Sequence, residues 1–123
     1  MKDPEEDRWR KKYPHFPGVQ KCVELLRSSN VKGTWVNIIC LELQAHAASN
    51  LSELVAAINA EEDERVKILL LAALAESGLP EAVPVFEEYL QSVQESLRYW
   101  AKFGLEKAGT REARTALWNY RNS

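Results

Sequence analysis

Residues 64–86 read ERVKILLLAALAESGLPEAVPVF, and this stretch decides the fold. Its apolar residues recur at spacings of three and four, which places them on one face of a helix. Gly78 follows this stripe and Pro80 opens the next apolar segment, because glycine adopts the left-handed conformation that ends a helix and proline fits a first turn. The stretch therefore predicts a helix over residues 63–77 and, after a turn, a second helix over 80–91. The stripe consists of Val66, Leu69, Leu70, Ala73 and Leu74.

The same pattern returns 31 residues later in the chain. Gly109 takes the place of Gly78, so a second helix pair is expected around it. Ser92 with Glu95 resembles a capping box that opens a helix ending near Ala108, and Thr110 is expected to cap a last helix over 111–120. Six identities carry this repeat: Glu64 with Glu95, Leu74 with Leu105, Gly78 with Gly109, Glu81 with Glu112, Ala82 with Ala113 and Tyr89 with Tyr120.

A third and weaker copy lies upstream. Thr34 is expected to cap a helix over 35–48, and Asn50, with Glu53 three residues later, to open a helix over 51–60.

Two further helices are expected before this copy, over 4–12 and 19–28. Between them, residues 13–18 contain two prolines and a glycine and are expected to form a rigid connector. The prediction is an all-α chain of seven or eight helices in a single domain. Its parts are N-terminal cap helices over 1–30 and helix-pair repeats over 31–62, 63–92 and 93–123.

Residues 64–86 resemble the short repeat of the HEAT-like alpha-solenoid family. In that repeat a charged residue and a hydrophobic pair open the first helix, and Pro-Glu-Ala-Val, present here as residues 80–83, starts the second. The resemblance implies a short right-handed alpha-alpha superhelix whose second helices line a concave groove. Glu53, Glu81 and Glu88 would then point into that groove. The second copy departs from the pattern, with Thr110-Arg111 where Leu79-Pro80 stands.

Composition and the chain start exclude several protein classes. The longest apolar run, residues 68–75, is far shorter than the roughly 20 residues needed to cross a bilayer. The start is charged, with no apolar segment behind it, which predicts a protein without a secretory signal. Cys22 and Cys40 lie among apolar neighbours and are expected to be reduced. We therefore expect a cytoplasmic protein.

No group of residues suggests catalysis, a metal or a cofactor. The two histidines, His15 in the connector and His46 near a helix end, are expected to be solvated or packed rather than to act as bases or ligands. Metal-binding spacings and phosphate-binding glycine loops are absent from the sequence. The acidic run over 61–64 is typical of a solvated helix start. The prediction is a protein that is not an enzyme.

The charge is uneven along the chain, although the net charge is only −2. Residues 1–52 carry a balance of +2, residues 53–95 of −8 and residues 96–123 of +4. Because each repeat of a solenoid occupies its own slab, the middle of the molecule should present an acidic surface. Its expected contributors are Glu53, Glu61, Glu62, Asp63, Glu81, Glu87 and Glu88.

An acidic surface favours a basic protein partner. The leading hypothesis is an inhibitor of the immunity-protein type that covers the basic active site of a toxin, for example a nuclease. The other interpretation is that these acids only keep the protein soluble.

The C-terminal third supports a competing interpretation, because basic residues alternate there with aromatic ones and could bind nucleic acid. Trp100 and Phe103 align with the apolar stripe of the first copy and are expected to pack in the core. Trp118 and Tyr120 are expected either to cap the stack or to face the partner. With a balance of only +4, nucleic acid is the disfavoured partner, and a scaffold or lyase-type adaptor is a third alternative.

Overall fold

The computed structural model describes residues 4–28, 30–31 and 33–122, and it confirms the all-helical prediction. No strand occurs in that part of the chain, so the two glycine turns join helices as expected. The outer limits of the predicted repeats at residues 1 and 123 lie outside the described residues. The helices are α1 (Pro4–Lys12), α2 (Val19–Arg27), α3 (Gly33–Ala45), α4 (Leu51–Ala60), α5 (Glu64–Ser77), η1 (Pro80–Ala82), α6 (Val83–Tyr89), α7 (Glu95–Ala108) and α8 (Arg111–Arg121).

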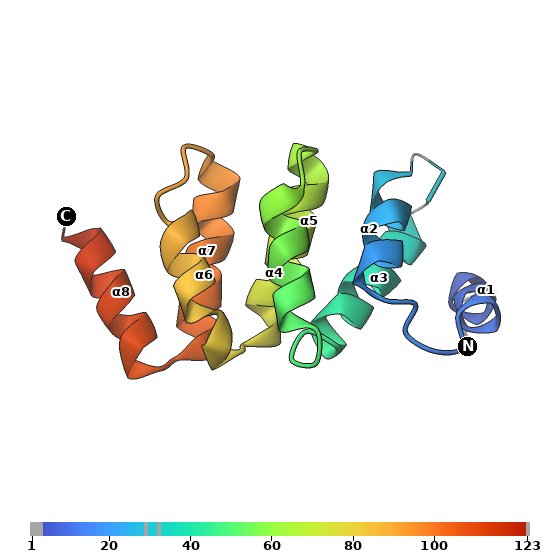
Figure 1. Ribbon diagram of the computed structural model, residues 1–123, viewed down its shortest axis with the longest axis horizontal. Helices are drawn as coiled ribbons and strands as arrows, with labels where there is room; N and C mark the ends of the chain where they lie inside the picture. Colours follow the sequence, from blue (N-terminus) through green and yellow to red (C-terminus); the bar gives the residue numbers. More distant parts are fainter. Residues whose placement is uncertain (1–3, 29, 32, 123) are drawn as a thin grey trace.

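From α2 to α8 the helices stand side by side in a row, with α1 at the N-terminal end (Figure 1). α5 packs against both α3 and α7, so these three helices form one layer. α4 packs on α5 and α6 packs on α7, so these shorter helices belong to a second layer. Two loops, 61–63 and 90–94, lie at the top edge of Figure 1, and the turns at 78–79 and 109–110 lie at the bottom edge. The right-handed superhelix and the HEAT-like family stay predictions.

The predicted ends of the helices at the glycines are confirmed. Gly78 and Gly109 have φ angles of 68° and 64°, the left-handed conformation that glycine adopts without steric cost. Asp63 caps α5 by accepting a hydrogen bond from the amide of Val66, and Thr110 caps α8 in the same way. α5 and α7 end, and α8 begins, where the sequence pattern predicted, while α5 begins one residue later than predicted.

Two other predicted caps are wrong, and a third residue has the predicted position without a capping hydrogen bond. Ser92 does not cap α7, because its hydroxyl accepts from the amide of Gln94 and the helix begins one residue later. Thr34 lies inside α3, which begins at Gly33. Asn50 is at the N-cap position of α4, which spans Leu51–Ala60 as predicted, but its side chain donates to the carbonyl of His46 and bonds no amide of α4. Ser92 and Asn50 each bond another nearby backbone group, which short polar side chains can reach as easily as a capping amide.

The core runs through both layers and is centred on α5. Six of its residues are buried, including Leu70, Leu71 and Leu74 with no exposed surface. α6 approaches α7 closely because Gly104 has no side chain: a Cβ there would lie 2.5 Å from Cζ of the buried Phe86. Trp100 and Phe103 are half-buried and pack against this core, as their alignment with the apolar stripe predicted.

We expect Leu74→Ala to lower the free energy of unfolding by about 2–5 kcal/mol, because it leaves a cavity between packed helices. Leu41→Ala is the matched control, since Leu41 is 62% exposed and its truncation should change stability by less than about 0.5 kcal/mol. Urea denaturation followed by circular dichroism measures both. Equal effects of the two substitutions would contradict the packing of α5.

Gly104→Ala should cost about 1–3 kcal/mol, because the added methyl group overlaps the ring of Phe86. The double variant Gly104→Ala/Phe86→Leu should recover part of this loss, since the smaller side chain makes room for the methyl group. A double variant whose loss equals the sum of the two single losses would show that α6 and α7 do not meet there.

Candidate protein-binding site

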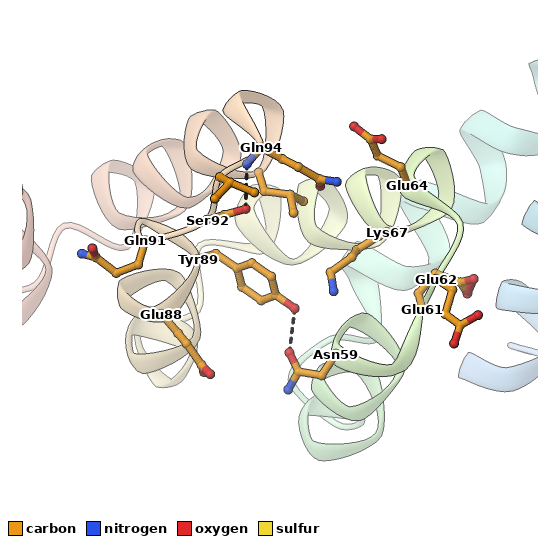
Figure 2. A pocket seen from close by; sticks show the side chains of 12 residues that line it. Asn59, Glu61, Glu62, Glu64, Lys67, Glu88, Tyr89, Gln91, Ser92 and Gln94 are labelled. Atoms are coloured by element: carbon orange, nitrogen blue, oxygen red, sulfur yellow. Dashed lines mark hydrogen bonds between the residues drawn. The ribbon is translucent and has the colours of Figure 1, made fainter.

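A groove of about 430 Å3 opens between the second-layer helices α4 and α6. α4 and α6 make few contacts with each other, and the first-layer helices α5 and α7 form the floor between them. Figure 2 shows the groove from close by. Its lining consists of Asn59, Glu61, Glu62, Glu64, Lys67, Glu88, Tyr89, Gln91, Ser92, Val93, Gln94 and Leu97.

Tyr89 connects the two walls of this groove. Its hydroxyl donates to Oδ1 of Asn59 on α4 across 2.7 Å, and the dashed line in Figure 2 shows this bond. Nζ of Lys67 rises from the floor to 5.4 Å from the centre of the tyrosine ring, within cation–π range. Burial raises the pKa of Tyr89, and Glu88 adds to this effect, so the hydroxyl stays protonated and remains a donor at neutral pH.

Three exposed glutamates surround this pair. Glu88 lies on the α6 side, Glu62 on the α4 side and Glu64 at the start of α5 (Figure 2). None of the three forms an ion pair with another described residue. The groove is therefore acidic at its rim, with one lysine at its centre.

Glu61 corrects the predicted acidic surface. It is only 5% exposed, and its carboxylate accepts from Nε and Nη2 of Arg27 at 2.8–3.1 Å. This ion pair lowers the pKa of Glu61 and joins the end of α2 to the loop before α5. The expectation that Glu61 contributes to an exposed acidic surface is wrong, because its carboxylate is buried and paired with Arg27. Asp63 stays exposed, but its side chain is occupied as the cap of α5.

The remaining predicted acids are exposed at other places. Glu53 lies in the first turn of α4 and Glu81 in η1, at the edge opposite the groove loops (Figure 1). Glu87 is exposed on α6 and does not line the groove. The groove thus brings together Glu61, Glu62 and Glu88, while Glu53 and Glu81 are separate from them.

The two predicted aromatic residues lie on α8, away from the groove. Trp118 is 65% exposed, whereas Tyr120 is half-buried with Nζ of Lys102 5.9 Å from its ring centre. The basic residues around them are largely engaged within the chain. Arg98 and Arg114 donate to backbone carbonyls, and Lys107 and Arg121 lie 3.7 and 3.6 Å from the carboxylates of Glu76 and Glu106.

The groove contains residues that were not predicted from the sequence as site residues. Asn59, Lys67 and Tyr89 carry no motif, although the repeated tyrosine at positions 89 and 120 was a signal that this side chain had a role. Val93 was assigned to a capping box, yet it is 96% exposed at the rim of the groove. Such a side chain offers a partner an apolar contact beside the acids.

The cysteines and metal-binding residue types form no site in the described part of the chain. Cys22 is buried, and burial raises the pKa of its thiol to about 12, so it stays protonated; Cys40 is half-buried. No three histidine, cysteine, aspartate or glutamate side chains come together to hold a metal ion there. Within the same residues, no helix has the length and apolar content to span a membrane.

Comparisons with known proteins add no relative. No protein-family model matches the chain, and searches of curated proteins and of solved structures each found no match.

The lowered pKa of Glu61 makes a prediction about pH. A carboxylate whose pKa is lowered in the folded state stabilises the protein above its ordinary pKa, and this contribution is lost as the pH falls through the folded value. Glu61→Gln should therefore lower the melting temperature by a few degrees at pH 7 and by much less near pH 3. The neighbouring Glu62→Gln is the control. An equal loss at both pH values would mean that the ion pair with Arg27 does not stabilise the fold.

Proposed function

We propose that this chain is a non-enzymatic protein-binding domain, which binds a basic segment of its partner at the groove between α4 and α6. One observation carries the proposal. Seven exposed glutamates between residues 53 and 95 form no ion pair with any described residue: Glu53, Glu62, Glu64, Glu81, Glu87, Glu88 and Glu95. Unpaired charges of one sign attract a partner of the opposite sign and accelerate its association.

The groove supports the proposal because it offers more than charge. Tyr89 and the exposed Val93 provide apolar surface, while Asn59 and Gln91 provide amide groups that can donate and accept hydrogen bonds. Because Lys67 at the floor repels positive charge, the basic groups of a bound segment should lie at the rim, next to Glu62 and Glu88. A flexible extended segment or a loop fits these dimensions better than a flat surface does.

The more specific proposal is a HEAT-like inhibitor, of the kind found among bacterial immunity proteins, that covers the basic active site of a toxin such as a nuclease in the cytoplasm. Its support is the sequence resemblance of residues 64–86, the side-by-side helix pairs and the excess of unpaired acids. A cleft that binds nucleic acid is itself basic, so an acidic groove matches it in charge.

Nucleic acid binding is the second candidate, and the exposure of Tyr99 and Trp118 favours it. They are 56% and 65% exposed, and exposed aromatic rings can stack on bases. Arg111 is exposed nearby on α8, but most basic residues of this region are bonded within the chain. A scaffold or a lyase-type adaptor would use the same surfaces in a larger assembly.

Charge reversal tests the proposal. We expect Glu62→Lys/Glu88→Lys to reduce capture of a basic protein from nuclease-treated native lysate at least tenfold at about 50 mM salt, because attraction to the groove is lost. Quantitative mass spectrometry of the captured proteins provides the measurement. Captured wild-type partner should also decline at about 300 mM salt.

Glu53→Lys/Glu81→Lys is the matched control, since it changes the charge equally at the opposite edge. It should retain most of the partner. All four side chains are exposed, so circular dichroism should show an unchanged fold for both variants. Equal retention by the two variants would contradict the groove as the binding site. Recovery of nucleic acid without nuclease, abolished by Arg111→Ala/Arg114→Ala, would support the second candidate instead.

A further inference from the structure

The outward side of α8 combines an exposed tryptophan with arginines. Ala113 and Leu117 are buried against the neighbouring helices α6 and α7, so the opposite side of α8 faces away from the row (Figure 1). Arg111 and Trp118 are seven residues apart, about two helical turns, and lie together on that outward side. Trp118 is 65% exposed, although tryptophan is highly buried on average.

The outward side of α8 is also basic, because the helix carries three arginines and a single acid. Arg111 forms no ion pair with another described residue. Arg114 donates from Nη1 to a backbone carbonyl, which leaves Nη2 and Nε for other acceptors. Arg121 lies 3.6 Å from a glutamate of α7, but both side chains are exposed and such surface pairs are weak. We call Arg111, Arg114, Trp118 and Arg121 the α8 face.

The groove between α4 and α6 has the complementary arrangement. Its rim carries the unpaired Glu62 and Glu88, while the ring of Tyr89 and the 96% exposed Val93 supply apolar contacts. Lys67 at its centre repels a basic group but attracts the face of an aromatic ring. A segment that carries an aromatic ring between basic groups therefore matches the groove, with the ring at the centre and the basic groups at the rim. The α8 face has this order along the helix.

In the folded chain, α8 cannot reach the groove of its own molecule. It packs on α7 and α6, and α6 lies between α8 and the groove (Figure 1). The α8 face points away from both of these helices, because the buried Ala113 and Leu117 lie on the other side of α8. A contact between the α8 face and the groove must therefore join two molecules.

We propose that the chain associates with itself head to tail: the α8 face of one copy binds the groove between α4 and α6 of another. A helix with anchors three and seven residues apart is a common ligand of a groove, and tryptophan and arginine often dominate the energy of an interface. The opposite charge balances of residues 53–95 and 96–123 favour the encounter. Because the two surfaces differ, a first pair leaves one groove and one α8 face free for further copies. This inference rests on the groove of the proposed function, and the second copy competes there with the basic partner.

Sedimentation equilibrium of the full chain tests this association. At about 50 mM salt, the weight-average mass should rise at least about 1.5-fold between about 10 and 500 µM protein, and the rise should decline at about 300 mM salt because the attraction is screened. Arg111→Ala/Trp118→Ala should stay monomeric. Arg8→Ala/Leu41→Ala is the matched control, since it removes one exposed arginine and one exposed apolar side chain elsewhere and should associate like the wild type.

A mixture of two variants tests which surfaces meet. Glu62→Lys/Glu88→Lys keeps its α8 face and Arg111→Ala/Trp118→Ala keeps its groove, so each variant alone should be monomeric. Mixed in equal amounts at about 50 mM salt, they should form dimers and no larger species, since only one intact α8 face and one intact groove can meet. The four changed side chains are exposed, and circular dichroism verifies that each variant is folded.

A wild type that is monomeric at low salt, or an association that salt does not weaken, would overturn the inference. So would an α8 variant that still associates, or a mixture that stays monomeric. The preparations are treated with nuclease, and a wild type that associates only after a short single-stranded oligonucleotide is added would assign the α8 face to nucleic acid instead.

The proposed function and this inference can fail separately. A monomeric wild type whose capture of a basic partner still requires Glu62 and Glu88 removes the self-association and leaves the proposed function intact. Self-association through the groove, combined with partner capture that is unaffected by the same two glutamates, removes the proposed function and leaves the second copy as the occupant of the groove.

Discussion

The packing of α5 between α3 and α7 places the other helices of this chain. α5 buries six side chains along its length, and its two ends are set by the Asp63 cap and the left-handed Gly78. Since α4 and α6 are joined to their first-layer partners by short connections, their positions follow from that of α5 and α7. Loss of apolar area at this helix would therefore affect both layers at once.

The groove is a consequence of how the second layer packs. α6 lies close to α7 at Gly104, and α4 packs on α5. Neither α4 nor α6 therefore fills the space between α4 and α6. The bond from Tyr89 to Asn59 spans this space without closing it. A site formed in this way rests on rigid helices at its floor and walls, and only the 61–63 and 90–94 loops at its rim lack helical support.

Charge has two roles in this molecule, and burial separates them. Glu61 is buried and paired with Arg27, so its charge contributes to the fold. The exposed Glu62 and Glu88 have no ion-pair partner within the described chain, and their charge is directed to solvent or to another molecule. In the C-terminal third, by contrast, bonds within the chain occupy most basic side chains, which leaves less positive charge available for a nucleic acid.

The helices could be predicted from the sequence because each depends on neighbours close in the chain. The apolar stripe that contains Leu70 and Leu74 predicts a helix from spacing alone. Gly78 and Gly109 likewise predict helix ends from their positions directly after such stripes. The cap at Ser92 failed because a short polar side chain can bond several nearby backbone groups, and sequence does not rank them.

The candidate site could be predicted only in part. The excess of negative charge over residues 53–95 was visible in the sequence, and it is what supports a basic partner. The ion pair of Glu61 is with Arg27, 34 residues earlier, and the hydrogen bond across the groove joins Tyr89 to Asn59, 30 residues earlier. By itself the sequence determined the helices and their total charge, because both follow from composition and local spacing. Only the tertiary structure decided which acids are exposed and where a groove opens, because contacts between distant residues depend on how the helices pack.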